Sequence, residues 1–169
     1  FSGVMDQPSN VQAVMHFAKE GWPLIHKQVE PARLLLVGKE PAKKILSLGK
    51  KDPSIVVTGF VPEVRDFLRH AAVFVSPLHL RSGIRNTALE AMACGLPVVS
   101  YADACGGLEA SPMRKVSTTQ DFADAVTQFL RDATLRLQVG ALSRKYITQH
   151  HSWNNQAKLY ERIFVQAQH

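Results

Sequence analysis

Four short apolar runs constrain the fold of this chain more than any other feature. They occupy residues 34–38, 55–59, 73–77 and 97–100. Each run is continuously apolar instead of alternating, and each ends on Gly, Pro or Ser. A strand that is covered on both faces has this pattern, which is usual in parallel sheets. The runs therefore predict a buried parallel sheet.

Helical periodicity fills the intervals between these runs. Apolar side chains fall on one helical face within residues 11–25, 64–71 and 84–92. Residues 1–3 have the pattern of the end of a strand, so strand and helix alternate from the start of the chain to about residue 101. This alternation is typical of α/β proteins. We predict a three-layer α/β/α, Rossmann-like, doubly wound parallel sheet.

The pattern changes after residue 101. A glycine-containing loop leads to a short strand near 114–116, and three helices follow. Their apolar stripes run over residues 122–130, 135–146 and 153–167. Thr118 with Asp121 three residues later resembles a capping box for the first of them. We expect the first two helices to complete the layers over the sheet. The last, over about 152–167, has no strand after it and is expected to pack on a part of the protein outside this chain.

Length and charge narrow the class of protein. The chain has 169 residues, of which 46% are hydrophobic, which suits one domain over residues 1–169 and excludes global disorder. No apolar run approaches the roughly 18–20 residues that a membrane span needs. The formal net charge of +6 indicates an anionic partner. The lysines at 43, 44, 50 and 51 have no aromatic residues between them, so we interpret them as a solvated helix face, with acidic lipid as the alternative, and expect no nucleic-acid partner.

In an open parallel sheet, ligands bind beyond the carboxyl ends of the strands. The most informative segment there is 76–93, in which a strand ends, a polar loop turns on Gly83 and a helix begins. Free backbone N–H groups at that helix start make an anion site, to which Arg81 and Arg85 can add charge. Glu90 lies about two turns into the helix, in an otherwise apolar stretch. Its carboxylate can accept hydrogen bonds from a vicinal diol such as ribose, and the alternative is a salt-bridged or solvent-facing helix residue.

The remaining reactive side chains are expected to play minor parts. Cys94 and Cys105 are too few for a disulfide framework and lack metal-ligand spacing, so we expect small buried side chains in a reducing compartment and no metal. His79 lies in the loop before Gly83 and is expected to be a loop histidine without a role, with a contact to a sugar as the alternative.

Several segments resemble a known family. Residues 89–99 read Leu-Glu-Ala-Met-Ala-Cys-Gly-Leu-Pro-Val-Val. They resemble the block that closes the donor site in GT-B glycosyltransferases, in particular the large retaining group called family 4. Further similar segments are 36–38, 57–61, 106–109, 152–153 and the opening residues 1–11. The last of these is similar to sugar transferases of bacterial exopolysaccharide clusters.

The resemblance implies that the chain is the donor-binding, C-terminal domain of such an enzyme. In the family, the last glutamate of the block hydrogen-bonds the nucleotide ribose, a role that falls to Glu90. The glycine turn holds the diphosphate through backbone amides, which implies Gly83 and Ile84, and the loop at Val61 holds the base. With the nearby polar positions included, the candidate donor-binding residues are Gly38, Lys39, Val61, Ser82, Gly83, Ile84, Arg85 and Glu90.

Three positions depart from the family pattern. Ser82 stands where the family has its first glutamate, which normally engages sugar hydroxyls, so the choice of donor sugar and the activity are open. Val4 and Asn10 stand where the family tends to have an Arg and a Lys that neutralise the diphosphate. Arg85, Arg81 and Lys39 are candidates to replace that charge.

The family pattern also implies the activity and the partners. A hexosyltransferase-like, retaining enzyme would take a nucleotide-diphosphate sugar as co-substrate, need no cofactor and act in polysaccharide biosynthesis. It would work in the cytoplasm, with peripheral contact at the inner face of the membrane as a further option. We expect an N-terminal acceptor domain upstream of this chain, so that the chain alone lacks turnover. Two alternatives stay open: one half of a nucleotide-sugar 2-epimerase, and a non-catalytic scaffold relic of a glycosyltransferase.

Overall fold

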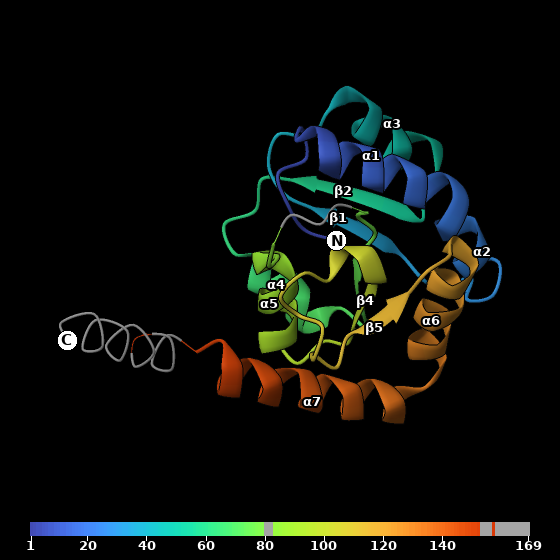
Figure 1. The fold of residues 1–169 in the computed structure, drawn as a ribbon. Coiled ribbons are helices and arrows are strands. Elements are labelled where there is room, and N and C mark those ends of the chain that lie inside the picture. Colours follow the sequence, from blue (N-terminus) through green and yellow to red (C-terminus); the bar gives the residue numbers. More distant parts are fainter. Residues whose placement is uncertain (80–82, 153–156, 158–169) are drawn as a thin grey trace.

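The computed structural model of this chain describes residues 1–79, 83–152 and 157. Helices and strands alternate along most of it (Figure 1). The first half contains α1 (Pro8–His16), the π-helical turn η1 (Phe17–Gly21), α2 (Trp22–His26), β1 (Leu34–Val37), α3 (Lys43–Lys51), β2 (Ile55–Gly59) and α4 (Val64–His70). The second half contains β3 (Phe74–Ser76), α5 (Asn86–Ala93), β4 (Val98–Tyr101), the 3-10 turn η2 (Ala102–Ala104), β5 (Arg114–Val116), α6 (Thr119–Arg131) and α7 (Ala133–His150). Within the described part of the chain, no helix is long and apolar enough to cross a membrane.

All the strand pairings are parallel, as the apolar runs predict, but they form two ladders. One ladder pairs β1 with β2, and the other has the order β3-β4-β5. Residues 1–3 lie along the free edge of β1, where Ser2 forms an isolated parallel bridge to Val37 and the Gly3 N–H donates to the Val37 carbonyl at 3.0 Å. The expected strand end at the start of the chain is therefore present, although it is very short.

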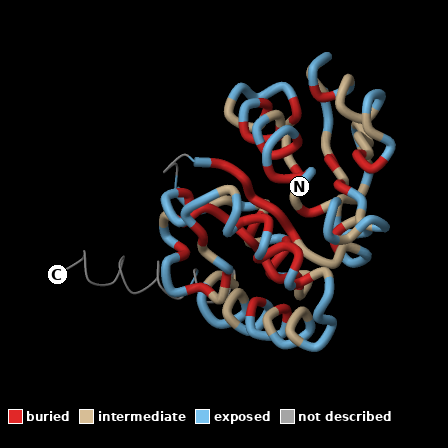
Figure 2. Tube along the Cα trace, turned by 90° about the vertical axis from the view of Figure 1, so that its right-hand side faces the viewer, coloured by how far each residue is buried: buried red, intermediate tan, exposed pale blue. Residues whose placement is uncertain are grey.

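Two hydrophobic cores, one on each face of the strands, give the three layers of the predicted fold. Successive strand residues point to opposite faces. Val75 and Val99 accordingly enter the core formed with α1, α2 and α6, whereas Phe74 and Val98 enter the core formed with α4 and α5. Figure 2 shows buried chain running through the middle of the molecule. The fold is thus the predicted α/β class, with helices covering both faces.

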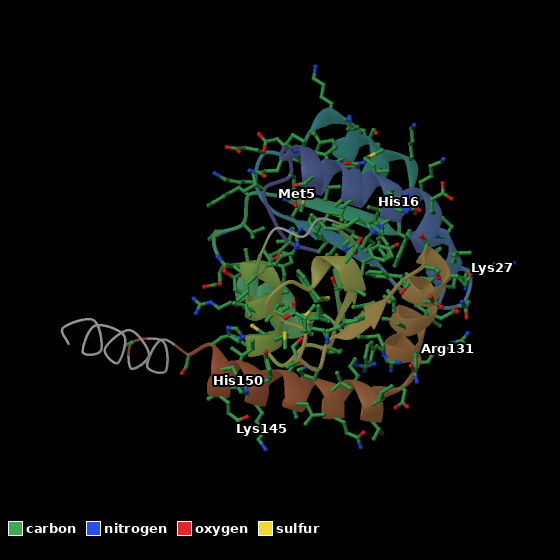
Figure 3. All side chains as sticks on the ribbon, in the orientation of Figure 1. Met5, His16, Lys27, Arg131, Lys145 and His150 are labelled. Atoms are coloured by element: carbon green, nitrogen blue, oxygen red, sulfur yellow. The ribbon has the colours of Figure 1, made fainter. Side chains whose placement is uncertain are left out.

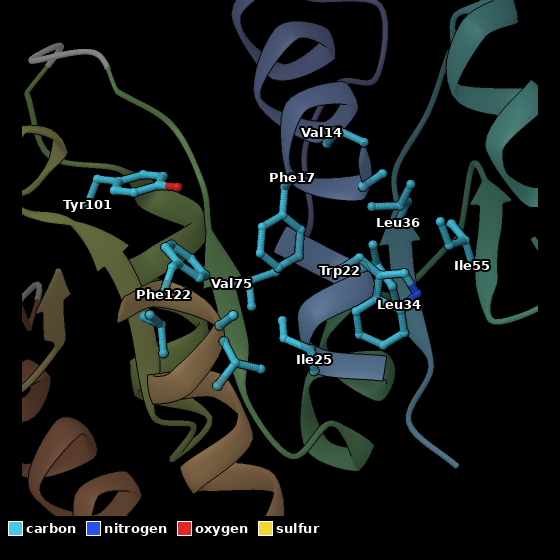
Figure 4. Packing of buried hydrophobic residues seen from close by; sticks show 14 of the residues in the cluster. Val14, Phe17, Trp22, Ile25, Leu34, Leu36, Ile55, Val75, Tyr101 and Phe122 are labelled. Atoms are coloured by element: carbon cyan, nitrogen blue, oxygen red, sulfur yellow. The ribbon is translucent and has the colours of Figure 1, made fainter. Parts of the chain in front are cut away.

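Aromatic rings fill the first core (Figure 4). Phe122 packs edge-on against Phe17 with ring centroids 5.2 Å apart, and its ring lies 5.0 Å from that of Tyr101. The sequence pattern predicts one continuous helical face over residues 11–25. The structure divides this stretch into α1, the turn η1 and α2, but Val14, Phe17 and Trp22 still reach the same core.

A buried hydrogen-bond chain ties the first core to the loop before β2. The indole N–H of Trp22 donates to Ser54 Oγ at 2.8 Å, and Ser54 Oγ donates to Asp52 Oδ1 at 2.6 Å. Hydrogen bonds from the Ser54 side chain and backbone also hold the pKa of Asp52 below its usual value.

The substitution Ser54→Ala is expected to lower the free energy of unfolding by about 1–3 kcal/mol, because the Trp22 N–H loses its partner in a buried place. Urea titration followed by Trp fluorescence measures this. The control is Ser47→Ala, which removes a hydroxyl that bonds only the Lys44 carbonyl on a helix surface. Equal midpoints for the two variants would show that the Trp22 hydrogen bond contributes nothing.

Of the two helices after β5, α6 lies as expected and α7 does not. Thr118 caps α6 as predicted, since its hydroxyl accepts from the Asp121 N–H, and α6 packs on the sheet. At the far end of α6, Arg131 donates to the Gln28 carbonyl at 2.8 Å, and Figure 3 shows it near Lys27. The expectation that α7 also covers the sheet is wrong, because α7 packs against α5 and α6 instead. The last expected helix, over 152–167, falls almost entirely outside the described residues.

Candidate functional site

The candidate site lies at the carboxyl ends of the strands, where the loops after β1, β2, β3 and β4 begin. Parallel pairing brings these ends to one edge of each ladder. The candidate residues follow the strands in this order: Gly38 and Lys39 after β1, Val61 after β2, Gly83, Ile84 and Arg85 after β3, and Glu90 inside α5. Ser82 and Arg81 lie outside the described residues.

The start of α5 is the most suitable anion-binding element of this edge. Arg85 occupies the N-cap position with extended backbone, and no side-chain hydrogen bond from a described residue caps the helix. The Asn86 and Thr87 N–H groups therefore stand at the positive end of the helix dipole without a capping side chain. The Arg85 side chain is half-buried, and this burial lowers the pKa of its guanidinium from the usual value.

The loop after β4 packs directly on the loop before α5. A Cβ atom added to Gly107 would lie 2.6 Å from Ile84 Cγ1, and one added to Gly106 would lie 4.0 Å from the Gly83 backbone. Ile84 itself is 44% exposed and lies before α5, not within it as the helical stripe predicts. The two loops thus lie close together, because the Ile84 side chain packs where Gly107 has none and Gly106 lies near the Gly83 backbone.

Glu109 stabilises the glycine loop from its far side. Its Oε1 accepts from the Gly107 N–H at 3.1 Å, and backbone hydrogen bonds, the largest from its own N–H, keep the pKa of Glu109 below the usual value. The segment 106–109 is similar to a family motif and follows the carboxyl end of β4, where ligands are expected, but none of its residues was among the donor-binding candidates. The structure brings it there, because β4 lies beside β3 and the two following loops share one edge.

Glu90 faces outward on α5, into a groove of about 680 Å³. The groove is also lined by Arg65 and Arg69 of α4 and by Arg144 of α7. Arg65 is already paired with Glu63, and hydrogen bonds from its side chain and backbone lower the pKa of Glu63 to about 2. Glu90 is exposed and makes no ion pair with any residue that the structure describes. The salt-bridged alternative therefore finds no support, whereas the exposure of Glu90 agrees with the solvent-facing alternative, and the contact with ribose stays a prediction.

Two other candidates have local partners. Lys39 is exposed, and its Nζ lies 3.8 Å from Glu40 Oε1. Gly38 has a packing role, because a Cβ atom there would lie only 1.7 Å from the Gly3 carbonyl oxygen. Val61 is half-buried directly beyond β2. Contact of these residues with a donor stays a prediction.

Both of the family's basic positions lack a charged side chain here, because Val4 and Asn10 occupy them. Asn10 donates from Nδ2 to the Val4 carbonyl at 2.9 Å and so fixes the turn between residues 1–3 and α1. Neither the Asn10 amide nor the Val4 side chain carries a charge. The positive charge for an anion must therefore come from elsewhere, and Arg85 is the described arginine at the start of α5.

His79 has defined partners within the described part of the chain, and its contact with a sugar stays a prediction. Its ring stacks on Tyr101 with centroids 3.7 Å apart, and its Nδ1 lies 3.3 Å from Asp103 Oδ2. The Tyr101 hydroxyl lies 3.2 Å from Thr119 Oγ1. Neither Tyr101 nor Asp103 was among the donor-binding candidates from the sequence, although both come at the carboxyl end of β4.

The cysteines are free in the structure. Cys105 is buried and its thiol donates to the Tyr101 carbonyl at 3.2 Å, while Cys94 is half-buried beside the groove of Glu90. Among the residues described, no group of three or more His, Cys, Asp or Glu side chains could hold a metal ion.

Comparison with solved structures supports the fold. A mutant of S. aureus TarM, in complex with fondaparinux, alpha-GlcNAc-glycerol and UDP, matches 96% of this chain with a TM-score of 0.80 and 16% identity. The C-terminal domain of LpcC from Francisella tularensis, a glycosyl transferase group 1 family protein, matches 90% of this chain and 84% of its own, with a TM-score of 0.71 and 19% identity. Anabaena HepE in complex with UDP-glucose matches 87% of this chain and 45% of its own, with a TM-score of 0.69 and 12% identity.

The chain spans about a third of the length of TarM and less than half that of HepE, since its matches cover 34% and 45% of those proteins. None of the curated proteins compared with the chain matches it. The model of the family described as glycosyl transferases group 1 matches residues 1–132, which include every candidate site residue. Together with the GT-B, Rossmann-like fold, this match shows that the chain belongs to the group 1 glycosyl transferases.

Proposed function

We propose that this chain is the donor-binding domain of a glycosyltransferase and takes a nucleotide-diphosphate sugar at the carboxyl ends of β3 and β4. The observation that carries the proposal is the start of α5. Its first N–H groups have no side-chain cap from a described residue, and the loop before it packs closely on the loop after β4, with the Ile84 side chain against Gly107 and the Gly83 backbone near Gly106. A diphosphate suits such a site, because peptide N–H groups and a helix dipole bind anions closely.

The proposed roles follow the order of the strands. The backbone of Gly83 and Ile84 would hold the diphosphate, with Arg85 adding positive charge. During glycosyl transfer the diphosphate is the leaving group, so these groups would stabilise the charge that develops on it. Glu90 would accept hydrogen bonds from the ribose hydroxyls, and the loop at Val61, beyond β2, would hold the base.

Solved relatives give this donor class its support. Structures of TarM contain UDP, and those of HepE contain UDP-glucose. A pneumococcal O-GlcNAc transferase, GtfA, is solved with UDP and GlcNAc and matches 99% of this chain at a TM-score of 0.73 and 12% identity. In our proposal the same class of ligand binds here without a cofactor, and Ser82 leaves the sugar unspecified.

The family resemblance extends the proposal to the whole protein. An N-terminal domain would hold the acceptor, transfer would retain the anomeric configuration, and the product would enter polysaccharide biosynthesis. The reaction would take place in the cytoplasm, at the inner face of the membrane. The present chain would then bind the donor without turnover, which distinguishes it from the full-length enzyme.

Isothermal titration of this chain with UDP, GDP and ADP tests the proposal. We expect at least one of the three to bind, and we expect Glu90→Ala to weaken that binding by on the order of 1–3 kcal/mol, because the ribose hydroxyls lose an acceptor. This corresponds to a Kd increase of about 5- to 150-fold.

The matched control is Glu30→Ala, which removes an exposed carboxylate from the loop before β1, at the opposite end of that strand. Its affinity should equal that of the unchanged chain. Absence of binding by all three nucleotides would refute the proposal, and equal losses in both variants would remove Glu90 from the site.

A full-length protein incubated with radiolabelled nucleotide sugars separates an enzyme from a scaffold relic. Transfer to an acceptor, or slow donor hydrolysis, would show that chemistry persists with Ser82 in place of the family's glutamate. Nucleotide binding without either reaction would identify a relic.

A further inference from the structure

The outer side of α3 carries exposed lysines near both ends of the helix. We call them the lysine face: Lys43, Lys44, Lys50 and Lys51. At 3.6 residues per turn they fall within about 120° of the helix circumference. They lie on the side away from Ile45 and Leu48, which pack into the first core. Figure 1 shows α3 at the end of the molecule opposite α7, so the lysine face is turned outward from the fold.

No acidic side chain balances this charge within the described part of the chain. α3 contains neither Asp nor Glu, and none of its lysines forms an ion pair with a described residue. Asp6 lines the same hollow between α1 and α3 as Lys44, but the two form no ion pair. Charges of alternating sign are typical of a helix face that is only solvated. The lysine face departs from that pattern.

Two of the lysines also stand at the unfavourable end of the helix. Lys43 and Lys44 are the first two residues of α3, and the first turn contains no acidic residue. The N-terminus of a helix is the positive end of its dipole, so anions there stabilise the helix and cations do the opposite. Violations of a local rule of this kind are expected at functional sites. An anionic partner at the lysine face would offset the cost.

An exposed apolar side chain borders the lysine face. Leu46 is 41% exposed, and it neighbours Lys50 on the helix surface because the two are four residues apart. Leucine beside lysines suits a membrane surface, where apolar side chains enter the boundary of the acyl chains and basic side chains stay among the headgroups. Nucleic acid is a poorer match, because α3 offers neither arginine for phosphate nor an aromatic ring for base stacking.

We propose that the lysine face and Leu46 form a docking surface for a membrane that contains anionic phospholipid. The lysines contact the headgroup phosphates, Leu46 enters the boundary of the acyl chains, and α3 lies along the membrane surface. This inference rests on the membrane location in the proposed function and not on nucleotide binding. It assigns the membrane contact to the domain described here and to one of its helices.

Co-sedimentation of this chain with lipid vesicles tests the docking surface. We expect binding to vesicles made of equal parts phosphatidylcholine and phosphatidylglycerol, and none to vesicles of phosphatidylcholine alone. Binding should weaken as salt is added, because the ions screen the lysines from the headgroups. Equal binding to both kinds of vesicle, or to neither, would overturn the proposal.

Paired lysine variants locate the contact. A lysine close to an anionic membrane surface contributes roughly a fivefold factor to binding, so Lys43→Gln combined with Lys50→Gln is expected to weaken binding roughly 30-fold. The control combines Lys27→Gln with Lys145→Gln, which changes the net charge equally. Both control lysines are exposed, and Figure 3 shows them away from α3. Equal losses in the two double variants would show that only net charge matters and would overturn the assignment.

Leu46→Gln tests the apolar part of the contact without changing the charge. We expect it to weaken vesicle binding roughly 3- to 8-fold, because the exposed part of the leucine no longer leaves water. Leu137→Gln is the matched control, since Leu137 of α7 is 74% exposed and should not touch the membrane. Vesicle binding that is unaffected by Leu46→Gln but displaced by a single-stranded oligonucleotide would overturn the proposal in favour of nucleic acid.

Nucleotide titration of the same variants separates this proposal from the proposed function. Replacement of Lys43 and Lys50 should leave nucleotide affinity and the midpoint of thermal unfolding unchanged, because both side chains are exposed and lie outside the candidate donor site. A chain that binds a nucleotide but no anionic vesicle would overturn the docking surface alone. A chain that binds anionic vesicles through α3 but none of the nucleotides would refute the donor site alone.

Discussion

Replacement of Gly38 by alanine is expected to lower the free energy of unfolding by roughly 2–5 kcal/mol, because overpacking and left-handed strain add together. The added Cβ atom would lie 1.7 Å from the Gly3 carbonyl oxygen, which belongs to the backbone and cannot rotate away. The φ angle of Gly38 is +153°, which adds the strain. Residues 1–3 would have to leave the edge of β1, and the hydrogen bond between Gly3 and Val37 would be lost.

Gly59→Ala is the matched control for this prediction. Gly59 also stands at the carboxyl end of a strand and has a positive φ of +69°, but a Cβ atom there would meet nothing within 4 Å. It is expected to cost about 1–2 kcal/mol from left-handed strain alone. Urea denaturation of both variants measures the difference. If Gly38→Ala were no more costly than Gly59→Ala, the close approach of Gly3 would not be a constraint.

The present chain is expected to lose stability as the pH falls from 8 to 5, because its terminal ammonium is buried. Burial lowers the pKa of the Phe1 amino group from 8.0 to about 5. Between these values the unfolded chain binds the proton and the folded chain does not, so a lower pH favours unfolding. The loss grows across this window to at most about 4 kcal/mol and then levels off below pH 5.

Acetylation of the terminus isolates this effect, because it removes the charge and leaves an N–H that can still donate to Leu35. The pH dependence from histidines and carboxylates is common to both chains and cancels in the comparison. Denaturant titrations of the free and the acetylated chain at pH 5 and pH 8 give the four free energies of unfolding. A difference between the chains that is the same at both pH values would contradict the buried ammonium.

The strands could be predicted to within one residue at either end, because local composition alone determines this kind of strand. β4 is buried along its whole length, with Val99 in one core and Val98 in the other, so nothing in its own sequence competes with the extended conformation. The Thr118 cap was predictable for the same local reason. These are cases in which a few neighbouring residues contain all the information needed.

The arrangement of the ladders and of α7 could not be predicted in this way. Whether β1 pairs with β3 depends on what lies between them, and no pattern within either strand records that. The position of α7 depends on a contact between Gly140 and the Gly95 carbonyl, 45 residues apart in the chain, where a Cβ atom would approach to 2.0 Å. Periodicity identifies the helix but not its neighbour.

In the candidate site, too, the local order of elements could be predicted from the sequence, whereas the contacts between distant segments could not. The strand–loop–helix order around Gly83 marks an anion site from sequence alone, and the structure confirms that order. The partners of this loop come from elsewhere: Gly107 contacts Ile84, and Asp103 lies beside His79. Both partners belong to the loop after β4, and they reach the site only because β4 pairs with β3.

The contact between Gly107 and Ile84 also limits which amino acids position 107 can accept. Gly107 is exposed, and exposed positions usually accept many residues. Here even the smallest side chain would have to displace the Ile84 side chain at the proposed diphosphate site, and the φ of +76° would add backbone strain whatever the space. In a random mutant library selected for donor binding, this surface position would accept as few replacements as a position in the hydrophobic core.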